Sequence, residues 1–381
     1  MIDNTKNGTI IMRVMCAIFF LLFTFLYLFD YQADILAVTQ HVLAHGATHY
    51  NRVIGAILLT VVLWALQLLV YGLSGLNQRF HALTYLPSLL LLGVLTDVSS
   101  NIDHESYLGN WLWGYPLLMV IYAGVVWICR QLESLEQSTG ESGVFSSLTW
   151  QNMLVMTVMG FVVCLLGNTD PIFHYRMRME ADLSKGAYAS ALQVGTDEAK
   201  TDSSLTMLRV WSLSEEHQLG DKLFTYPLVG GSNAMLPNGS SVKLMMADER
   251  YLYAHLGVVF KEKLSPLAYL EILHRRHRAT TAAHDWLLCA YLLDRNLKQF
   301  ACTLPKYYTI NDSLPKHYQE ALILYNHMTS HPFVLFRNSV GDADFDDYQD
   351  LQKKYANKRE RYTALREKYG NTYWFYYQYQ R

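Results

Sequence analysis

The chain has 381 residues, of which 17% are charged and 51% are hydrophobic, and its formal net charge is −2. These averages hide a division, because residues 1–169 hold 5 Lys and Arg with 9 Asp and Glu, whereas residues 170–381 hold 26 and 24. The charged fraction is therefore about 8% in the first part, too low for a water-exposed surface, and about 24% in the second, which is ordinary for a soluble domain. A single soluble enzyme and a disordered chain are both excluded.

Five apolar segments of the first part come near the roughly 20 residues that a helix needs to cross a bilayer. They are residues 14–29, 53–73, 82–98, 111–129 and 148–166. A secretory signal peptide is the alternative for the first segment, because Lys6 and Arg13 precede it and Ala33 follows it. The length of this apolar run and the four further segments favour a span. The sequence thus predicts an all-α chain with a five-span transmembrane domain over residues 1–169.

The basic residues of the short connections predict the orientation of these spans. Lys6, Arg13, Arg79 and Arg130 fall on one side of the membrane, and Arg52 alone falls on the other. Because cytoplasmic loops carry the excess of Lys and Arg, the N-terminus is expected in the cytoplasm. An odd number of spans then places the second part of the chain outside the cytoplasm.

The first outer loop contains His41, His45 and His49, spaced four residues apart. On a helix, neighbouring members would lie about 6 Å apart along the axis, close enough for two imidazoles to share an ion such as Zn²⁺. Asp97 and His104 are expected at the same membrane surface and could complete a metal site. The favoured alternative is an amphipathic interfacial helix whose histidines lie at headgroup level. No other cofactor is expected.

Residues 170–341 show helical spacing and a partial internal repeat. Residues 253–260 and 286–293 share the order aromatic, apolar, small, apolar, with first residues 33 apart, and residues 318–325 follow 32 later. This spacing is close to the 34-residue period of tetratricopeptide repeats. The sequence therefore predicts tetratricopeptide-like helical hairpins, with the Gly- and Pro-rich residues 226–240 as a long ordered loop.

Residues 342–381 carry a tyrosine pattern with a period of seven, formed by Tyr348, Tyr355, Tyr362 and Tyr369. It predicts one long helix that caps the repeats and ends at Gly370. The aromatic residues 373–379 are expected to fold back on the domain or to lie at the bilayer surface.

Arg275, Arg276 and Arg278 form the densest basic run, which could hold an anion but also suits the end of a helix, the favoured reading. Cys289 and Cys302 fall in one predicted hairpin, and two buried thiols are favoured over a disulfide. Nucleic acid is not an expected partner, because residues 170–381 carry a net charge of only +2. No phosphate-binding loop, nucleophile elbow or His-Glu-x-x-His motif occurs, so no catalytic residue is assigned.

Several short passages resemble an uncharacterised family of multi-span membrane proteins from Bacteroides-type bacteria, which carries a repeat-like helical C-terminal region. The passages are residues 40–43, 48–51, 80–85, 95–98, 226–227 and 372–377. The resemblance implies a bacterial inner-membrane protein, with the second part of the chain in the periplasm. It implies no activity and no catalytic residue.

Two hypotheses for function follow. The first is a scaffold or binding protein of the cell envelope, anchored in the lipid bilayer, whose stacked hairpins present a surface to a protein or peptide partner. The second is an integral-membrane enzyme or transporter with a metal or proton site at the outer membrane face, built from the histidine group and Asp97.

Overall fold

The structure of the chain is a computed structural model that describes residues 2–100, 102, 107–133, 146–196, 200–237, 241–259 and 264–379. Side chains are described from Ile10 onward, apart from that of residue 133. The chain forms two compact units, Met1–His174 and Tyr175–Arg381, which we name the membrane unit and the C-terminal unit. The described residues of both units form helices and no strand, as the sequence predicts.

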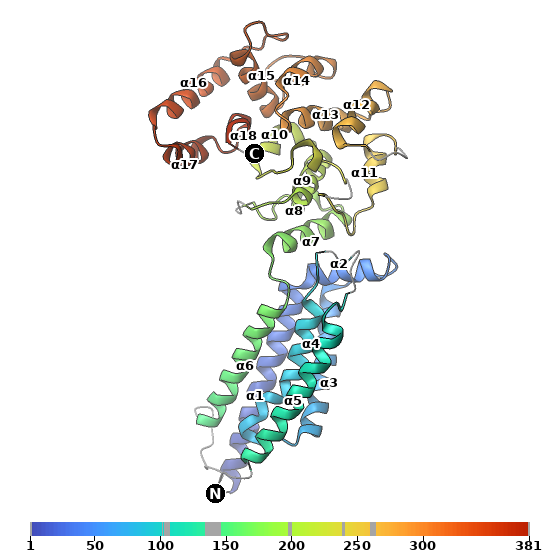
Figure 1. Cartoon of the computed structure of the whole chain (residues 1–381), viewed down its shortest axis with the longest axis vertical. Helices are drawn as coiled ribbons and strands as arrows, with labels where there is room; N and C mark the ends of the chain where they lie inside the picture. The colour runs from blue at the N-terminus through green and yellow to red at the C-terminus, as the bar shows by residue number, and fades with distance from the viewer. Residues whose placement is uncertain are drawn as a thin grey trace. The chain divides into compact units, whose positions relative to one another are not determined.

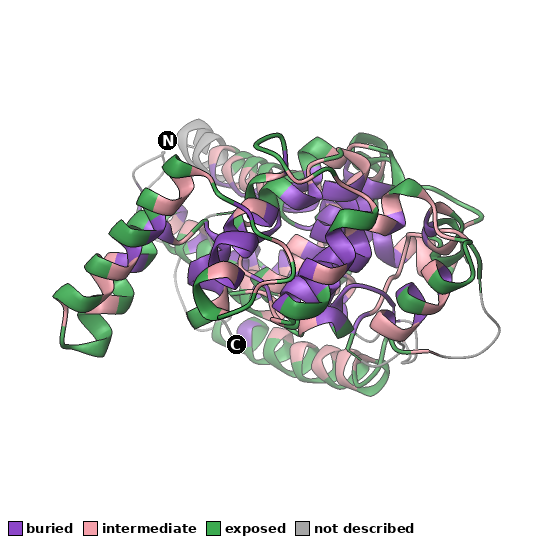
Figure 2. Ribbon diagram, turned by 90° about the horizontal axis from the view of Figure 1, so that it is seen from above, coloured by how far each residue is buried: buried purple, intermediate pink, exposed green. Residues whose placement is uncertain are grey.

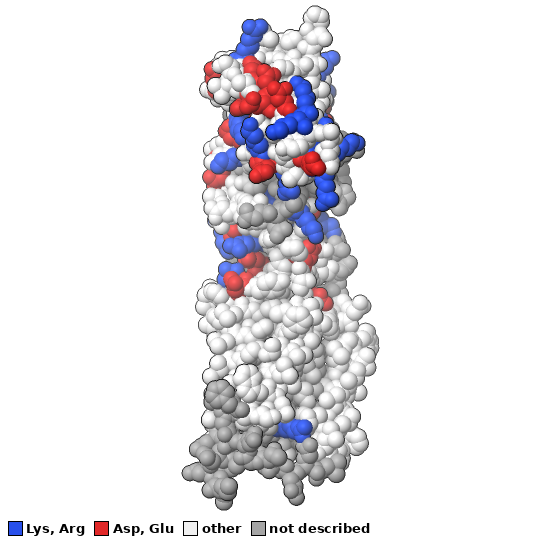
Figure 3. All heavy atoms as spheres, turned by 90° about the vertical axis from the view of Figure 1, so that its left-hand side faces the viewer, with Lys and Arg blue, Asp and Glu red and all other residues white. Residues whose placement is uncertain are grey.

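The membrane unit contains the five helices that the apolar segments predict (Figure 1). Its elements are α1 (Ile2–Leu26), the π-helical turn η1 (Tyr27–Tyr31), α2 (Ala33–Leu43), α3 (Arg52–Ser74), the 3-10 helix η2 (Gln78–Tyr85), α4 (Leu86–Thr96), α5 (Trp111–Glu133) and α6 (Ser147–Leu166). The stretches long and apolar enough to cross a membrane are Ile10–Tyr31, Arg52–Ser74, Gln78–Thr96, Trp111–Leu132 and Ser147–Leu166. Figure 3 shows a surface over this unit with very few charged side chains, which indicates association with a membrane.

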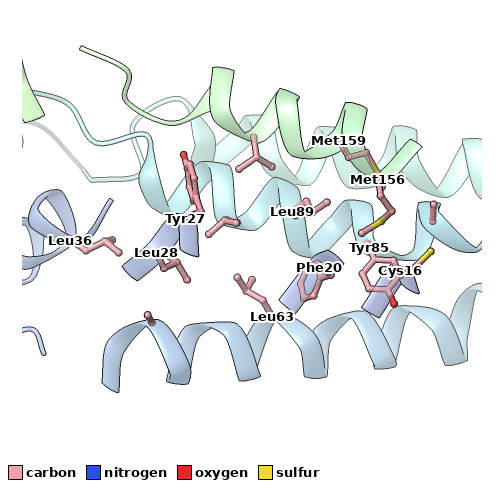
Figure 4. Packing of buried hydrophobic residues seen from close by; sticks show 14 of the residues in the cluster. Cys16, Phe20, Tyr27, Leu28, Leu36, Leu63, Tyr85, Leu89, Met156 and Met159 are labelled. Atoms are coloured by element: carbon pink, nitrogen blue, oxygen red, sulfur yellow. The ribbon is translucent and has the colours of Figure 1, made fainter. Parts of the chain in front are cut away.

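The third span lies at the centre of the membrane unit. Of its apolar window, 61% is buried inside the unit, against 6% for the fourth span, Trp111–Leu132. The core around it joins Phe20 of α1, Leu63 of α3, Leu89 of α4 and Met156 of α6 (Figure 4). Helix α5 therefore exposes its apolar side chains, which is the arrangement expected of a lipid-facing helix.

Uncharged polar side chains link the helices inside this core. The Asn152 amide accepts a hydrogen bond from the backbone N–H of Ala82 at 2.8 Å and donates to the carbonyl of Gln78 at 3.0 Å. Gln67 on α3 donates to Thr84 at 3.1 Å. Because lipid offers no hydrogen-bonding partners, such side chains hold helices together by satisfying one another and the backbone.

A second polar cluster lies where η1, α4 and the end of α6 meet. The Tyr27 hydroxyl is 3.2 Å from Thr96 Oγ1, and the Gln32 amide donates to the Tyr27 hydroxyl at 3.2 Å and to the carbonyl of Asn168 at 3.3 Å. A Cβ at Gly167 would overlap the Tyr27 hydroxyl. Only glycine therefore lets the chain leave α6 this close to the cluster.

The C-terminal unit consists of helices of 4 to 16 residues. They are α7 (Pro171–Ser184), which begins at the end of the membrane unit, α8 (Tyr188–Ala191), α9 (Ser203–Glu215), α10 (Leu219–Lys222), α11 (Glu249–Leu256), α12 (Pro266–Arg275), α13 (Thr281–Leu293), α14 (Leu297–Thr303), α15 (Lys316–Met328), α16 (Ser339–Lys354), α17 (Lys358–Tyr369) and α18 (Tyr373–Tyr379), with short 3-10 turns at Leu223–Thr225, Gly231–Ala234 and Leu304–Lys306. Helix α13 is central, with Trp286 fully buried, and Figure 2 shows the buried residues in the interior with the exposed ones outside.

Two of the three predicted repeat copies fall within single helices. Residues 286–293 lie within α13, with the small residue Ala290 buried, and residues 318–325 lie within α15, where Leu322 occupies the position of the small residue and is also buried. In the first copy, however, Gly257 ends α11 with a φ of 151°, and a Cβ there would overlap the carbonyl of Arg278. The small residue of that copy therefore serves a turn rather than a helix interface, because only glycine adopts this backbone conformation.

The long C-terminal helix predicted from the tyrosine pattern is wrong. Helix α16 ends at Lys354, and α17 begins at Lys358. Between them Tyr355 has extended backbone angles, and the Asn357 side chain caps α17 by accepting a hydrogen bond from the N–H of Arg359 at 2.9 Å. The break folds α17 back against α16, so that the two halves of the tyrosine stripe belong to different helices.

Two buried charges fix loops of the C-terminal unit. The carboxylate of Glu180 accepts hydrogen bonds from the backbone N–H groups of Met245 and Met246 at 2.6 and 2.8 Å. The guanidinium of Arg209 donates to the carbonyl of Pro227 at 2.7 Å, within the predicted loop of residues 226–240. Residues 238–240 of that loop lie outside the described residues, and the rest is ordered, as the sequence predicts.

Candidate functional site

The C-terminal unit contains a cleft with a volume of about 540 Å³ between α15, α16, α17 and α18. This volume lies within the range of about 300–1,000 Å³ typical of ligand pockets. Its lining combines apolar and aromatic side chains with amides and cations. The lining residues are Leu324, His327, Met328, Phe345, Tyr348, Gln349, Gln352, Lys353, Arg361, Trp374, Tyr377 and Gln378.

The position of α18, which forms one wall of the cleft, depends on the buried Glu320 of α15. Its carboxylate accepts a hydrogen bond from the backbone N–H of Tyr373 at 2.7 Å and lies 2.9 Å from Nδ1 of the buried His317. Its carbonyl accepts from Trp374 Nε1 at 2.8 Å. One residue therefore satisfies the first turn of α18 and anchors its tryptophan, which fixes this wall on α15.

Tyrosine hydroxyls attach the other side of α18 to the end of α13. Tyr373 donates to the carbonyl of Leu292 at 3.2 Å, and Tyr376 donates to that of Leu293 at 2.9 Å. These carbonyls belong to the last turn of α13, where no intrahelical partner is left. Burial raises the pKa of Tyr373 well above its ordinary value, so its hydroxyl stays a protonated donor. The aromatic tail thus folds back on the domain, the first of the two predicted outcomes.

The floor of the cleft is aromatic. The ring centroids of Phe345 and Trp374 lie 5.0 Å apart, and those of Phe345 and His327 lie 4.8 Å apart. Tyr348 is 3% exposed, and its hydroxyl donates to the side-chain oxygen of Gln378. Burial raises the pKa of Tyr348, so this donor is also kept. The floor is therefore closely packed. Because Phe345 and Trp374 are only 3% and 4% exposed, the apolar surface open to a ligand comes mainly from Met328, which is 58% exposed.

The rim of the cleft is polar. Gln349, Gln352 and Lys353 come from α16, Arg361 from α17 and Gln378 from α18. None of the lining residues is Asp or Glu. A ligand held here would meet amides, two permanent cations and an aromatic floor.

The histidines predicted as metal ligands do not share one helix. Helix α2 ends at Leu43 after His41, His45 has a φ of 48°, and His49 lies in the following loop. Gly46 packs against the His41 ring, and both His45 and His49 are exposed. Helix α2 itself buries one apolar side, including Ile35 and Val38, as an amphipathic helix does.

Of the two remaining predicted metal ligands, His104 lies outside the described residues. Asp97 ends α4, and its carboxylate accepts a hydrogen bond from Trp111 Nε1 at 2.6 Å. In the part of the chain that the structure describes, no three His, Cys, Asp or Glu side chains come together as a metal site. The metal site therefore stays a prediction from the sequence.

The basic run lies at the C-terminal end of α12. Arg275 is in its last turn, Arg276 is the residue that ends it, and Arg278 follows His277, which has a φ of 52°. The three arginines are exposed. This placement is the one that the helix-end alternative predicts, because cations there complement the helix dipole. Binding of an anion stays a prediction.

Cys289 and Cys302 are free thiols in the structure. Cys289 is fully buried on α13, and its Sγ lies 3.6 Å from the hydroxyl of Tyr318. Burial raises the pKa of the Cys289 thiol, which keeps it unreactive. This matches the buried-thiol alternative for Cys289, whereas Cys302 is half-buried.

Comparison with known proteins gives one match. Residues 250–380 match the model of a family of unknown function, DUF6057. The match covers about a third of the chain and includes every residue that lines the cleft. Neither the curated proteins nor the solved structures compared with the chain give a match.

The sequence patterns described above do not predict the cleft. Its signal on α16 is a set of residues spaced as one helix side, namely Phe345, Tyr348, Gln349, Gln352 and Lys353. The seven-residue tyrosine pattern obscured this side, because it treats Tyr348 and Tyr355 as equivalent although only the former lies on the packed side of α16. Recognising the break at residues 355–357 would have separated the two helices that face the cleft.

Proposed function

We propose that this chain is a membrane-anchored binding or scaffold protein of the bacterial cell envelope, whose C-terminal unit holds a protein or peptide partner. The observation that carries the proposal is the cleft between α15, α16, α17 and α18. It combines an exposed apolar side chain, Met328, with polar groups at its rim, the composition of sites that hold a side chain and the backbone beside it. The membrane-length helices would keep this cleft near the bilayer surface.

The packing of successive helices supports a tetratricopeptide-like reading of this unit. Helices α12, α13, α14 and α15 each pack against the next in the chain. A row of helices packed in this way presents an extended surface, and repeat proteins use such surfaces to hold partners. The cleft lies at the C-terminal end of this row.

We place the chain in the inner membrane, with its N-terminus in the cytoplasm and its C-terminal unit in the periplasm. Basic side chains at one end of the bundle support this orientation. Arg130 donates to the carbonyl of Leu73 at 3.3 Å, and the guanidinium of Arg13 lies 5.2 Å from the centre of the Tyr71 ring. Arg79 is the second residue of η2, the next element after α3. An excess of arginine at one end is typical of the cytoplasmic side.

Photo-crosslinking in the cell tests the binding function. A photoreactive amino acid at Gln352, on the cleft rim, is expected to capture a partner reproducibly from the full-length chain in its native membrane. The matched control is the same amino acid at Lys298, an exposed residue of α14 outside the cleft. If Gln352 captures nothing beyond what Lys298 captures, the cleft is not the binding site of this protein.

Reporter fusions test the location. A reporter that is active only in the cytoplasm is expected to work when fused after residue 75 and to be silent after residue 200. A periplasmic reporter should give the reverse pattern. Cytoplasmic activity at residue 200 would overturn the proposed orientation without touching the binding function.

A further inference from the structure

Several polar groups at the cleft rim have no partner among the residues that the structure describes. The side-chain amides of Gln349 and Gln352, and the guanidinium of Arg361, make no hydrogen bond or ion pair with any described residue. Lys353 pairs with Asp350 at 3.1 Å, but both side chains are more than 70% exposed, so this ion pair contributes little. The cleft therefore retains hydrogen-bonding capacity that water fills when no ligand is bound.

Two cations and no carboxylate line the cleft. Helix α16 carries five aspartates, namely Asp342, Asp344, Asp346, Asp347 and Asp350, and none of them lines the cleft. Instead Lys353 and Arg361 line it, although Asp350 pairs with Lys353 at 3.1 Å, and Asp347 pairs with Lys368 of α17 at 3.8 Å. Figure 3 shows acidic and basic side chains next to one another on the surface of the C-terminal unit.

The two cations of the lining favour an anionic ligand. Arginine presents several donors in one plane that match a carboxylate, and it carries its charge at every physiological pH. Burial raises the pKa of the neighbouring Tyr379 hydroxyl, and the positive charge of Arg361 acts to lower it. Like charges would repel a cationic ligand from the same place, so the rim selects by repulsion as well as by attraction.

We propose that the cleft takes an acidic peptide segment of the partner protein. A carboxylate of the segment pairs with Arg361 and Lys353, its backbone amide groups bond to Gln349 and Gln352, and an adjacent apolar side chain packs on Met328, an apolar lining residue that is 58% exposed. The inference rests on the proposed binding function and names the chemistry of its ligand. The volume of about 540 Å³ suits a few residues of extended chain rather than the surface of a folded domain.

Peptide selection tests this proposal with the full-length chain in nanodiscs of neutral phosphatidylcholine. The probe is a phage-displayed library of random heptapeptides. We expect Asp and Glu to be enriched at least threefold over the starting library, next to an aromatic or aliphatic residue. A selection that enriches no peptides, or that enriches basic or neutral ones, overturns the proposal.

A matched set of variants then assigns the charge effect to the cleft. The best acidic peptide and its Asn/Gln counterpart, identical in shape, are compared by fluorescence anisotropy. We expect at least tenfold tighter binding of the acidic peptide, a loss of most of this difference in Arg361→Gln, and its retention in Arg361→Lys. Arg359→Gln removes the same charge from an exposed residue of α17 outside the cleft and should change little.

If Arg361→Gln and Arg359→Gln reduce the preference for the acidic peptide equally, the preference comes from the overall charge of the surface, and the cleft is not the binding site. Equal binding of the acidic and neutral peptides would also contradict the proposal. The same holds if a neutral chitin tetrasaccharide displaces the acidic peptide. If Gln352 captures a partner in the cell while the acid preference is absent, only the ligand chemistry fails. If capture fails as well, the proposed function fails with it.

Discussion

The two units bury polar groups in different ways. In the membrane unit the buried side chains that link helices are neutral amides and hydroxyls, such as Asn152, Gln67 and Thr96. In the C-terminal unit ionisable groups serve as links as well, namely Glu320, Glu180 and Arg209, beside neutral hydroxyls such as that of Tyr373. The difference follows from the solvent on the outside of each unit.

An unpaired charge inside a lipid-facing bundle has neither water nor a strong partner. The free energy needed to desolvate it therefore exceeds the stabilisation that one hydrogen bond gives. In a water-soluble unit, a buried carboxylate or guanidinium can be surrounded by several backbone groups, and it then fixes loops that have no apolar side to pack. Burial lowers the pKa of Arg209 to about 10, which still leaves it charged at neutral pH. Each unit therefore buries the kind of polar group that its surroundings can supply with hydrogen-bonding partners.

The largest expected effect concerns Glu320. We expect Glu320→Ala to cost about 3–5 kcal/mol locally, because it leaves the Tyr373 N–H and the buried His317 without their acceptor. Hydrogen exchange of the full chain, measured by mass spectrometry, should show at least 100-fold faster exchange of α18. Glu367→Ala on the exposed side of α17 is the control. Unchanged protection of α18 in Glu320→Ala would show that buried charge is not what fixes this helix.

The close packing at Gly167 gives the next effect. Gly167→Ala is expected to destabilise the membrane unit by about 1–3 kcal/mol, because the added Cβ overlaps the Tyr27 hydroxyl and lies 2.9 Å from Thr96 Oγ1. Gly124→Ala on α5, where a Cβ meets nothing within 4 Å, should instead be neutral or stabilising. Thermal unfolding in detergent measures both. Equal melting temperatures for the two variants would contradict the close packing of Gly167 against Tyr27 and Thr96.

A neutral polar link should be weaker than a charged one. Asn152→Ala removes the acceptor of the Ala82 N–H and the donor to Gln78, and we expect a loss of about 1 kcal/mol. Gln151→Ala, one residue earlier on the exposed side of α6, should have no effect. Titration of the full chain from mild detergent into SDS compares them. A loss as large as that of Glu320→Ala would break the distinction between the two units.

The smallest effect is a pH dependence of the C-terminal unit. Burial raises the pKa of Glu180 although Arg176 and the N–H groups of Met245 and Met246 oppose this, so the folded state holds the proton more tightly than the unfolded state. Stability from this group is then greatest at acidic pH and falls as the pH rises from the unfolded value, about 4.3, through the folded pKa. Glu180→Gln, which never ionises, should therefore gain relative to the native chain between pH 4.5 and 7.5.

Urea titration at the two pH values measures the Glu180 effect, and Glu249→Gln on the exposed first turn of α11 serves as the control. A difference between Glu180→Gln and the native chain that is the same at both pH values would show that Glu180 is charged throughout.

The sequence predicted the spans well and the cleft not at all. A span is a local property, because about 20 apolar residues in a row leave no other stable placement, and the five segments carry this signal without reference to their neighbours. The cleft joins Leu324, Tyr348, Arg361 and Trp374 from four helices. No spacing within one segment encodes such a group, since each helix contributes only one to five of the lining residues.

The tyrosine pattern and the histidine group show the same limit in detail. Tyr348 and Tyr369 do meet, with ring centroids 5.3 Å apart, but they meet across the bend between α16 and α17 rather than along one helix. His41, His45 and His49 have the spacing of one helix side, yet α2 ends at Leu43. In both cases a period read from the sequence assumed a continuous helix, and a short capped break decided otherwise.

The sequence by itself determined the division into an apolar and a charged part, the helical class and the placement of five membrane-length helices. These follow from hydrophobicity and helix rise, which act over neighbouring residues. Only the tertiary structure decided which side of α16 faces a cleft, and that one buried carboxylate, Glu320, holds the aromatic tail in place. The physical reason is that a site is made where helices pack together, and packing depends on groups far apart in the chain.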